Sequence, residues 1–302
     1  MTLLASPYFR WLFLGLYFLA VSSLHLQVSF LLISPVGSIV PAEHGTFGSV
    51  ILLLILVSVI VSQAVRGTER ARTFIFWGLW LGTVVFSEYL FVLKRLEYIH
   101  YPQYAFLAIL LGLCLDPSRK KFPIGRILFW TTLLGIADEI NQYFFLCSIY
   151  GDYLDFNDFF LNLQGAMAGI LLYYGFRRIP EPSSRERDKG NSRTRGRGIK
   201  RIFLGPEGVT VLSVLVVCIV FAMSGRLQIR TNVEIPPGGI GEINGKKVFF
   251  LERKPGKMDN WNQEVMNREY YVLGPAKGLI LLMATGFVFF AYGWRRPRVN
   301  DQ

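Results

Sequence analysis

Long apolar segments constrain this chain more than any other feature of its sequence. About eight of them alternate with polar stretches, and most reach the roughly 20 residues that a helix needs to cross the hydrocarbon layer of a membrane. The segments lie at about residues 11–33, 48–65, 73–93, 101–115, 124–147, 156–176, 207–224 and 277–294. A soluble domain of 302 residues has no need of so many. We therefore expect an all-α polytopic membrane protein with about eight transmembrane helices.

Lysine and arginine residues are distributed unevenly among the loops between these segments. Most follow the second, fourth, sixth and eighth segments, whereas the short loops on the other side hold only Lys94 and Arg95. Basic residues concentrate in the cytoplasmic loops of membrane proteins. The sequence therefore predicts that both termini are cytoplasmic. We interpret the first apolar segment as an uncleaved helix, because it has a thin charged region and further spans follow it.

A polar, basic stretch at 179–204 divides the chain. It lacks any apolar period, which predicts a flexible cytoplasmic linker that is solvated or rests on anionic lipid headgroups. No aromatic residues are interleaved with its basic ones, so we expect no nucleic-acid partner. The predicted organisation is an N-terminal two-helix segment at 1–72, a helical core at 73–178, this linker, and a C-terminal two-span unit at 205–302.

The last two spans are separated by about fifty residues, 225–276, on the predicted outer side. Asn244 and Gly245 are flanked by strand-forming residues, a pattern that predicts a two-residue β-hairpin. The stretch that begins at Asp259, DNWNQEVMNREYYVL, predicts a helix capped by that aspartate. We expect a small α+β extracytoplasmic cap, which either covers a site, binds a partner or only connects the two spans.

Acids, amides and one histidine gather at the adjoining ends of three predicted helices, where an ionisable group in lipid is costly. Three sets share the spacing of one helix face: Glu97, His100 and Tyr104; Glu139 and Gln142; and Asp158, Asn162, Gly165 and Gly169. In the predicted topology all three sets lie near the outer face, so we expect one polar pocket. Gly165 and Gly169 form a small-xxx-small pair that lets another helix approach closely.

The residue types in this pocket suit two kinds of chemistry. Glu139, Asp155 and Asp158 offer the hard oxygen ligands that Mg²⁺ or Ca²⁺ prefers, or one of them is a protonated acid beside an ionised neighbour. His100 fits a general base or a proton shuttle. The predicted substrate-binding or orienting residues are Tyr104, Gln142 and Asn162. For single residues a structural role remains open, since Asp155 or Asn157 can simply cap the sixth helix.

The three polar sets together resemble the VanZ-like family of bacterial membrane proteins. The resemblance rests on EYIHYPQYAFL at 97–107, DEINQYF at 138–144 and D-x-x-x-N-x-x-G-A-x-x-G from Asp158 to Gly169, and it covers roughly 75–178. It makes these residues the family's signature positions: His100, Tyr104, Glu139, Gln142, Asp158, Asn162, Gly165 and Gly169. Many members have an arginine near the position of Asp152, in a Pro-Gly-Arg turn. Its absence here disfavours phosphate binding by the turn itself and favours a metal.

The resemblance implies a function in the bacterial cell envelope. The family takes its name from low-level resistance to a glycopeptide antibiotic, and it has been likened to membrane enzymes that exchange or hydrolyse lipid headgroups. We expect a multi-pass inner-membrane protein that acts on the headgroup or phosphate linkage of a lipid or polyprenyl carrier at the outer leaflet, as a metal-assisted transferase or hydrolase. The alternatives are a non-catalytic lipid- or glycopeptide-binding module and a proton-coupled transporter. The transporter is disfavoured because the polar residues cluster at one face rather than at the midplane.

Overall fold

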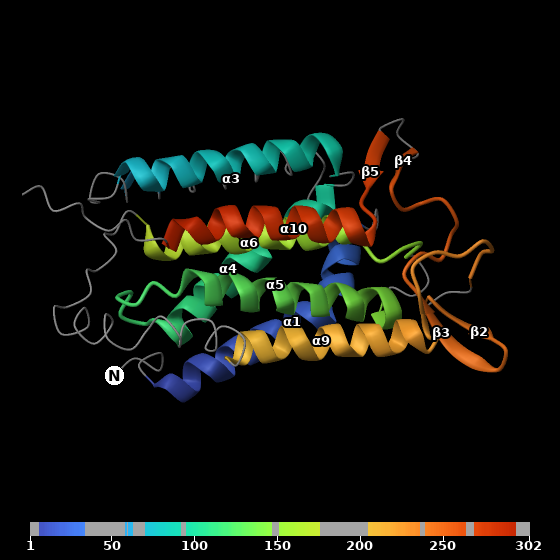
Figure 1. The fold of residues 1–302 in the computed structure, drawn as a ribbon. Helices are drawn as coiled ribbons and strands as arrows, with labels where there is room; N and C mark the ends of the chain where they lie inside the picture. Colours follow the sequence, from blue (N-terminus) through green and yellow to red (C-terminus); the bar gives the residue numbers. More distant parts are fainter. Residues whose placement is uncertain are drawn as a thin grey trace, which may run out of the picture.

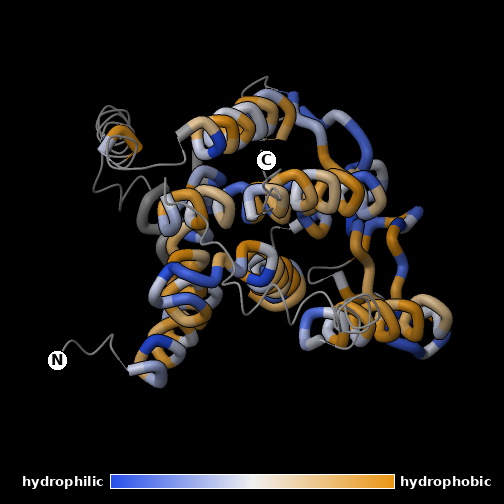
Figure 2. Tube along the Cα trace, turned by 60° about the vertical axis from the view of Figure 1, so that its left-hand side comes forward, coloured by the Kyte–Doolittle hydropathy of each residue, from blue (hydrophilic) through white to orange (hydrophobic). Residues whose placement is uncertain are grey.

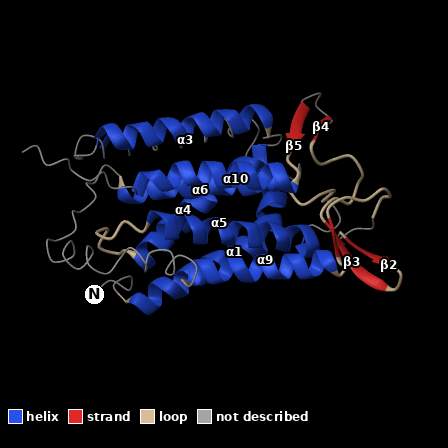
Figure 3. Ribbon diagram, in the orientation of Figure 1, coloured by secondary structure: helices blue, strands red, loops and turns tan. Residues whose placement is uncertain are grey.

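The computed structural model of the chain is mostly helical, with two small sheets at one end of the helices (Figures 1 and 3). It describes residues 6–33, 58, 60–62, 70–91, 95–146, 151–175, 205–235, 239–263 and 269–293. The α-helices are α1 (Pro7–Ile33), α3 (Arg70–Leu90), α4 (His100–Leu115), α5 (Ile124–Asn141), α6 (Phe156–Tyr174), α9 (Pro206–Met223) and α10 (Pro275–Phe290). Short helical turns cover Arg95–Ile99, Gln142–Leu146 and Ala291–Gly293.

Five of the described helices are long and apolar enough to cross a membrane. They comprise Pro7–Leu24, Ala71–Leu90, Glu97–Leu115, Pro206–Met223 and Pro275–Gly293. Figure 2 shows hydrophobic residues along the helices, and α9 has no buried residue at all. A helix that is apolar on every side and packs against little protein is typical of a membrane span. The structure thus fits a membrane protein with at least these helices as candidate spans.

The other three predicted spans are not among these five helices. α5 and α6 form at the predicted positions, although neither is among the five. Most of the second predicted span lies outside the described residues, as do the basic linker at 179–204, Lys94 and both chain ends. The number of eight spans, the four-part organisation and the orientation of the termini therefore stay predictions.

α6 is the central helix of the described core. It contacts α3, α4, α5 and α10, and nearly all of its residues are buried. Leu161, Met167 and Ile170 are among its fully buried apolar side chains. α1 packs against α4. Since α4 and α5 both lie against α6, polar residues at their adjoining ends are brought to one place.

The closest approach to α6 is made by α4, over Gly165 and Gly169. A Cβ atom added to Gly169 would lie 2.1 Å from the carbonyl oxygen of Ala105, and one added to Gly165 would lie 2.8 Å from the carbonyl oxygen of His100. Any side chain at either position would collide with the α4 backbone. The two glycines therefore permit the helix contact that brings His100 against α6.

The segment between α9 and α10 folds into two small sheets. In the first, β1 (Leu227–Gln228) runs parallel to β3 (Lys246–Phe250), and β2 (Ile240–Ile243) runs antiparallel to it. The hairpin predicted at Asn244 and Gly245 is confirmed, because both residues have the positive φ angles, 52° and 72°, that a type I′ turn requires. The second sheet pairs β4 (Asn260–Gln263) with β5 (Glu269–Val272), antiparallel.

The helix predicted to begin at Asp259 is wrong, because β4 and β5 occupy the described part of that stretch. Trp261 pairs with Tyr271 across the two strands, and their rings meet edge to face at 5.5 Å. Cross-strand aromatic pairs favour a hairpin over a helix. Asp259 itself has a left-handed backbone, φ 58°, and caps no helix. The described residues of the cap at 225–274 thus contain strands and loops without a helix.

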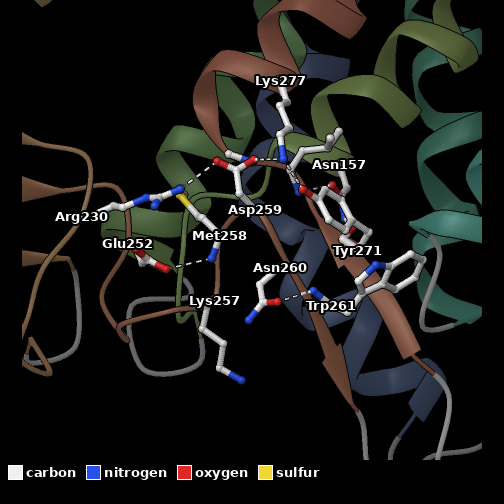
Figure 4. Close-up of polar contacts among 12 residues, drawn as sticks. Asn157, Arg230, Glu252, Lys257, Met258, Asp259, Asn260, Trp261, Tyr271 and Lys277 are labelled. Atoms are coloured by element: carbon white, nitrogen blue, oxygen red, sulfur yellow. Dashed lines mark hydrogen bonds and ion pairs between the residues drawn. The ribbon is translucent and has the colours of Figure 1, made fainter.

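The Asp259 side chain instead joins the cap to α10. Its carboxylate lies between Arg230, at 2.8 Å, and Lys277 of α10, at 3.4 Å (Figure 4). The amide of Gly274, the residue before α10, also donates to it, at 3.0 Å. The long-range partners of Asp259 explain why its local sequence context predicts the wrong structure.

Candidate functional site

His100 is the first residue of α4, and its imidazole is buried where α4, α5 and α6 meet. Its Nδ1 lies 2.7 Å from Oδ1 of Asn162 on α6 and 3.7 Å from a carboxylate oxygen of Glu139 on α5. Its Nε2 lies 3.6 Å from Oδ1 of Asp158, one turn before Asn162 on α6. Residues that the sequence predicted to share a pocket are therefore placed around one imidazole ring.

A hydrogen bond also links the two residues on the Nδ1 side of this ring. The side-chain amide of Asn162 donates to Oε1 of Glu139 at 3.2 Å. His100, Glu139 and Asn162 are 4%, 4% and 0% exposed. The Asp158 side chain is 17% exposed, so the Nε2 side of the imidazole is the less buried side of the site.

One nitrogen and two carboxylates in this site can hold a metal ion. Ligand atoms of His100, Glu139 and Asp158 all lie within 4.8 Å of one another. Imidazole suits Zn²⁺ and other transition metals, and carboxylates suit Mg²⁺, Ca²⁺ and Mn²⁺. The presence of the imidazole adds transition metals to the Mg²⁺ or Ca²⁺ that the carboxylates alone predicted.

The charge around Asp158 also favours a cation. The charged groups that act on this side chain are other carboxylates: Glu97, Asp138, Glu139 and Asp155. Carboxylates in such a site repel one another unless one of them takes up a proton or a positive charge is bound among them. The donor set and the surplus of negative charge therefore both fit a bound cation.

Asp155 has a structural role at the start of α6. It is the N-cap of this helix, and its carboxylate accepts a hydrogen bond from the backbone amide of Asn157 at 2.8 Å. It does not belong to the group of three ligands. We therefore interpret Asp155 as a helix cap, the alternative that its position in the sequence had left open.

Tyr104 and Gln142 bind a second carboxylate rather than the imidazole. Both donate to Oδ2 of Asp138, at 2.8 and 3.1 Å, and the amide of Gln103 lies 3.5 Å from the same oxygen. Asp138 is fully buried, and its Oδ1 has no hydrogen-bond partner among the residues that the structure describes. The Tyr104 ring lies nearly parallel to that of His100, with centroids 6.1 Å apart. The Asp138 group thus supports one face of the histidine.

Asp138 and Gln103 were not among the predicted site residues. Gln103 lies three residues after His100, a spacing that places both on one helix face and could have identified it. Asp138 lies four residues before Gln142, so the same reasoning places these two on one helix face. Gln142 reaches Asp138 at the point where α5 passes into a π-helical turn, Gln142–Leu146. Such turns change the direction of the side chains that follow.

The cap is attached to the connection between α5 and α6, next to the site. The amide of Leu154 donates to the carbonyl of Leu251 at 2.7 Å, and the Tyr143 hydroxyl donates to the carbonyl of Phe250 at 3.0 Å. Asp152 pairs with Lys254 of the cap at 2.9 Å. Asp152 thus joins the α5–α6 connection to a basic residue of the cap.

Two further residues tie this connection to the second sheet and its surroundings. The Asn157 side chain donates to the carbonyl of Tyr271 at 2.9 Å and accepts from the amide of Leu273 at 3.0 Å. Tyr153 is partly buried beside Tyr270, and this burial raises the pKa of its phenol well above the usual value. These contacts favour a cap that braces the connection between α5 and α6 over a cap that only connects two helices.

Fold and site together define a helical protein with membrane-length helices and a buried histidine–carboxylate site at one end of them. Comparisons with protein-family models, curated proteins and solved structures found no match to this chain. The resemblance to the VanZ-like family therefore rests on the three sequence motifs alone.

Proposed function

We propose that the protein is a VanZ-like enzyme of the bacterial inner membrane that acts on the headgroup or phosphate linkage of a lipid or polyprenyl carrier at the outer leaflet. The observation that carries this proposal is the buried imidazole of His100 between Glu139 and Asp158, at the end of helices of membrane length. An ionisable group buried among membrane helices is costly and is typically functional.

In this proposal His100 is the general base. Its Nε2 accepts the proton of a water or an alcohol as the oxygen attacks phosphorus, and the leaving oxygen takes up a proton as the old bond breaks. Glu139 and Asp158 are the residues that would hold a divalent cation. When bound, such a cation supplies positive charge that neutralises the phosphate and its developing negative charge. Asn162 orients the imidazole, and the Asp138 group supports it.

The test compares membrane lipids by mass spectrometry in cells that carry His100→Ala or Asp158→Asn. Both variants are expected to lose the product that the wild-type protein forms at equal expression. The matched control is Gln164→Leu, which removes another buried polar side chain of α6 whose amide binds Thr83 and Ser87 of α3. This control is expected to keep the product. A wild-type lipid profile in both site variants refutes a catalytic role.

The side of the membrane is tested separately. Alkaline phosphatase and GFP fusions made before and after residues 95–100 report on which side this turn lies. Phosphatase activity there is expected, with GFP fluorescence at both termini. A cytoplasmic position for His100 would refute action at the outer leaflet but would not bear on the proposed chemistry of the site.

A second candidate function is a non-catalytic lipid- or glycopeptide-binding module. For such a module, His100→Ala lowers retention of the ligand, while the lipid composition of the membrane stays unchanged.

A further inference from the structure

We propose that Glu139 acts on His100 through Asn162, as a positioning residue that fixes which imidazole nitrogen carries the proton. This inference deepens the proposed function, on which it depends only for the use made of the imidazole. The Glu139 side chain orients the amide, the amide oxygen accepts a hydrogen bond from Nδ1–H, and Nε2 is thereby the ring nitrogen without a hydrogen.

The argument begins with the donor and acceptor ends of Asn162. A side-chain amide has one accepting oxygen and one donating nitrogen, and Oε1 of Glu139 is the acceptor in its contact with Asn162. The amide nitrogen therefore faces Glu139, at 3.2 Å, which leaves Oδ1 facing the imidazole at 2.7 Å. Because Oδ1 only accepts, Nδ1 of His100 must carry the hydrogen. The hydrogen bond that Glu139 accepts from Asn162 thus determines the tautomer of a ring whose Nδ1 lies 3.7 Å from Glu139 itself.

Burial fixes this orientation of the Asn162 amide. His100, Glu139 and Asn162 are each less than 5% exposed, so water does not compete for their hydrogen bonds. The opposite tautomer would place two lone pairs against each other at 2.7 Å in a buried site. The ring is also fixed from the side of Tyr104, whose hydroxyl is held by Asp138.

The consequence is a lone pair on the accessible side of the site. Nε2 faces Asp158 at 3.6 Å, too far for a direct hydrogen bond, and Asp158 is the most exposed residue of the group. A base that takes a proton and a ligand that binds a metal both need this lone pair. In metal sites the other ring nitrogen typically donates to a fixed acceptor, as Nδ1 does here.

The test measures the tautomer directly by ¹⁵N NMR of histidine-labelled, full-length protein in lipid nanodiscs, above neutral pH and with a chelator present. Replacing His25 and His44 with glutamine leaves His100 as the only one of the three histidines. This parent protein is expected to show a single Nδ1–H tautomer. Glu139→Leu frees the amide to turn, and a signal from the Nε2–H tautomer is expected to appear.

A second substitution separates orientation from loss of packing. In Glu139→Leu with Asn162→Asp, the aspartate accepts from Nδ1–H with either oxygen and needs no orienting partner, so the single Nδ1–H tautomer is expected to return. Gln164→Leu, two residues further along α6, is the matched control and is expected to leave the tautomer unchanged. Where Glu139→Leu does not fold, Glu139→Gln replaces it, because a glutamine amide can present either end to Asn162.

An Nε2–H tautomer in the parent protein overturns the inference, and so does a Glu139 variant that keeps Nδ1–H alone. The lipid assay distinguishes this failure from failure of the proposed function. Loss of lipid product in His100→Ala with an unchanged tautomer in Glu139→Leu refutes the positioning role and supports the enzyme. The expected tautomers without any lipid product support the positioning role and refute the enzyme.

Discussion

Replacing Gly169 with alanine tests the packing on which the site depends. The added Cβ would lie 2.1 Å from the carbonyl oxygen of Ala105, and ordinary contact begins at 3.4 Å, so α4 must move by about 1.3 Å (3.4 − 2.1). Overpacking of this kind costs about 1–3 kcal/mol. A shift of the same size at His100 would lengthen its 2.7 Å contact with Asn162 beyond hydrogen-bonding distance. We expect both lower stability and a disturbed imidazole.

The matched control is Gly82→Ala in α3, where an added Cβ meets nothing within 4 Å. There alanine is expected to stabilise the helix by about 0.5–1 kcal/mol, because it loses less conformational entropy than glycine. Unfolding of both variants in detergent is followed by tryptophan fluorescence, and lipid product is measured in parallel. If Gly169→Ala proves as stable as Gly82→Ala and keeps its lipid product, the close contact of α4 with α6 is not what holds the site.

Three further changes test the surroundings of the site. Asp155→Ala removes the cap of α6 and is expected to lower the free energy of unfolding by about 1 kcal/mol. Asp155→Ser restores the cap and is expected to keep full lipid activity. Lost activity in the serine variant would instead support Asp155 as a metal ligand. Asn157→Ala removes two hydrogen bonds to the cap and is expected to increase proteolysis of residues 226–274. Unchanged cleavage would mean that other contacts hold the cap in place. Burial raises the folded-state pKa of Tyr153, so its contribution to stability is complete below the unfolded value of about 10 and is lost as the pH rises above it. Tyr153→Phe is therefore expected to lose less stability than wild type between about pH 9 and 11 in denaturant unfolding, and an identical slope would contradict a buried, neutral phenol.

Elements with a strong local signal could be predicted from the sequence. Apolar runs of membrane length placed the helices, since a single run of that length crosses lipid as a helix, which satisfies its backbone hydrogen bonds internally. Asn244 and Gly245 gave the hairpin, because few other residues tolerate positive φ at both central positions. The helix predicted from Asp259 failed where Trp261 and Tyr271, ten residues apart, made a better contact across strands.

For the site, the sequence predicts which residues share a helix face, and the tertiary structure determines which residues they hydrogen-bond. Helical spacing places Asp158 and Asn162 on one face of α6, and no fold is needed to see it. The spacing cannot say that Asn162 lies between His100 and Glu139, nor that Tyr104 binds Asp138, because those contacts join residues more than twenty positions apart. Periodicity is a local property of one helix, whereas a hydrogen-bond partner depends on how three helices pack. Gly165 and Gly169 of α6 can be read from the sequence and also determine the packing, because they have no side chains and α4 can come close enough for the contacts to form.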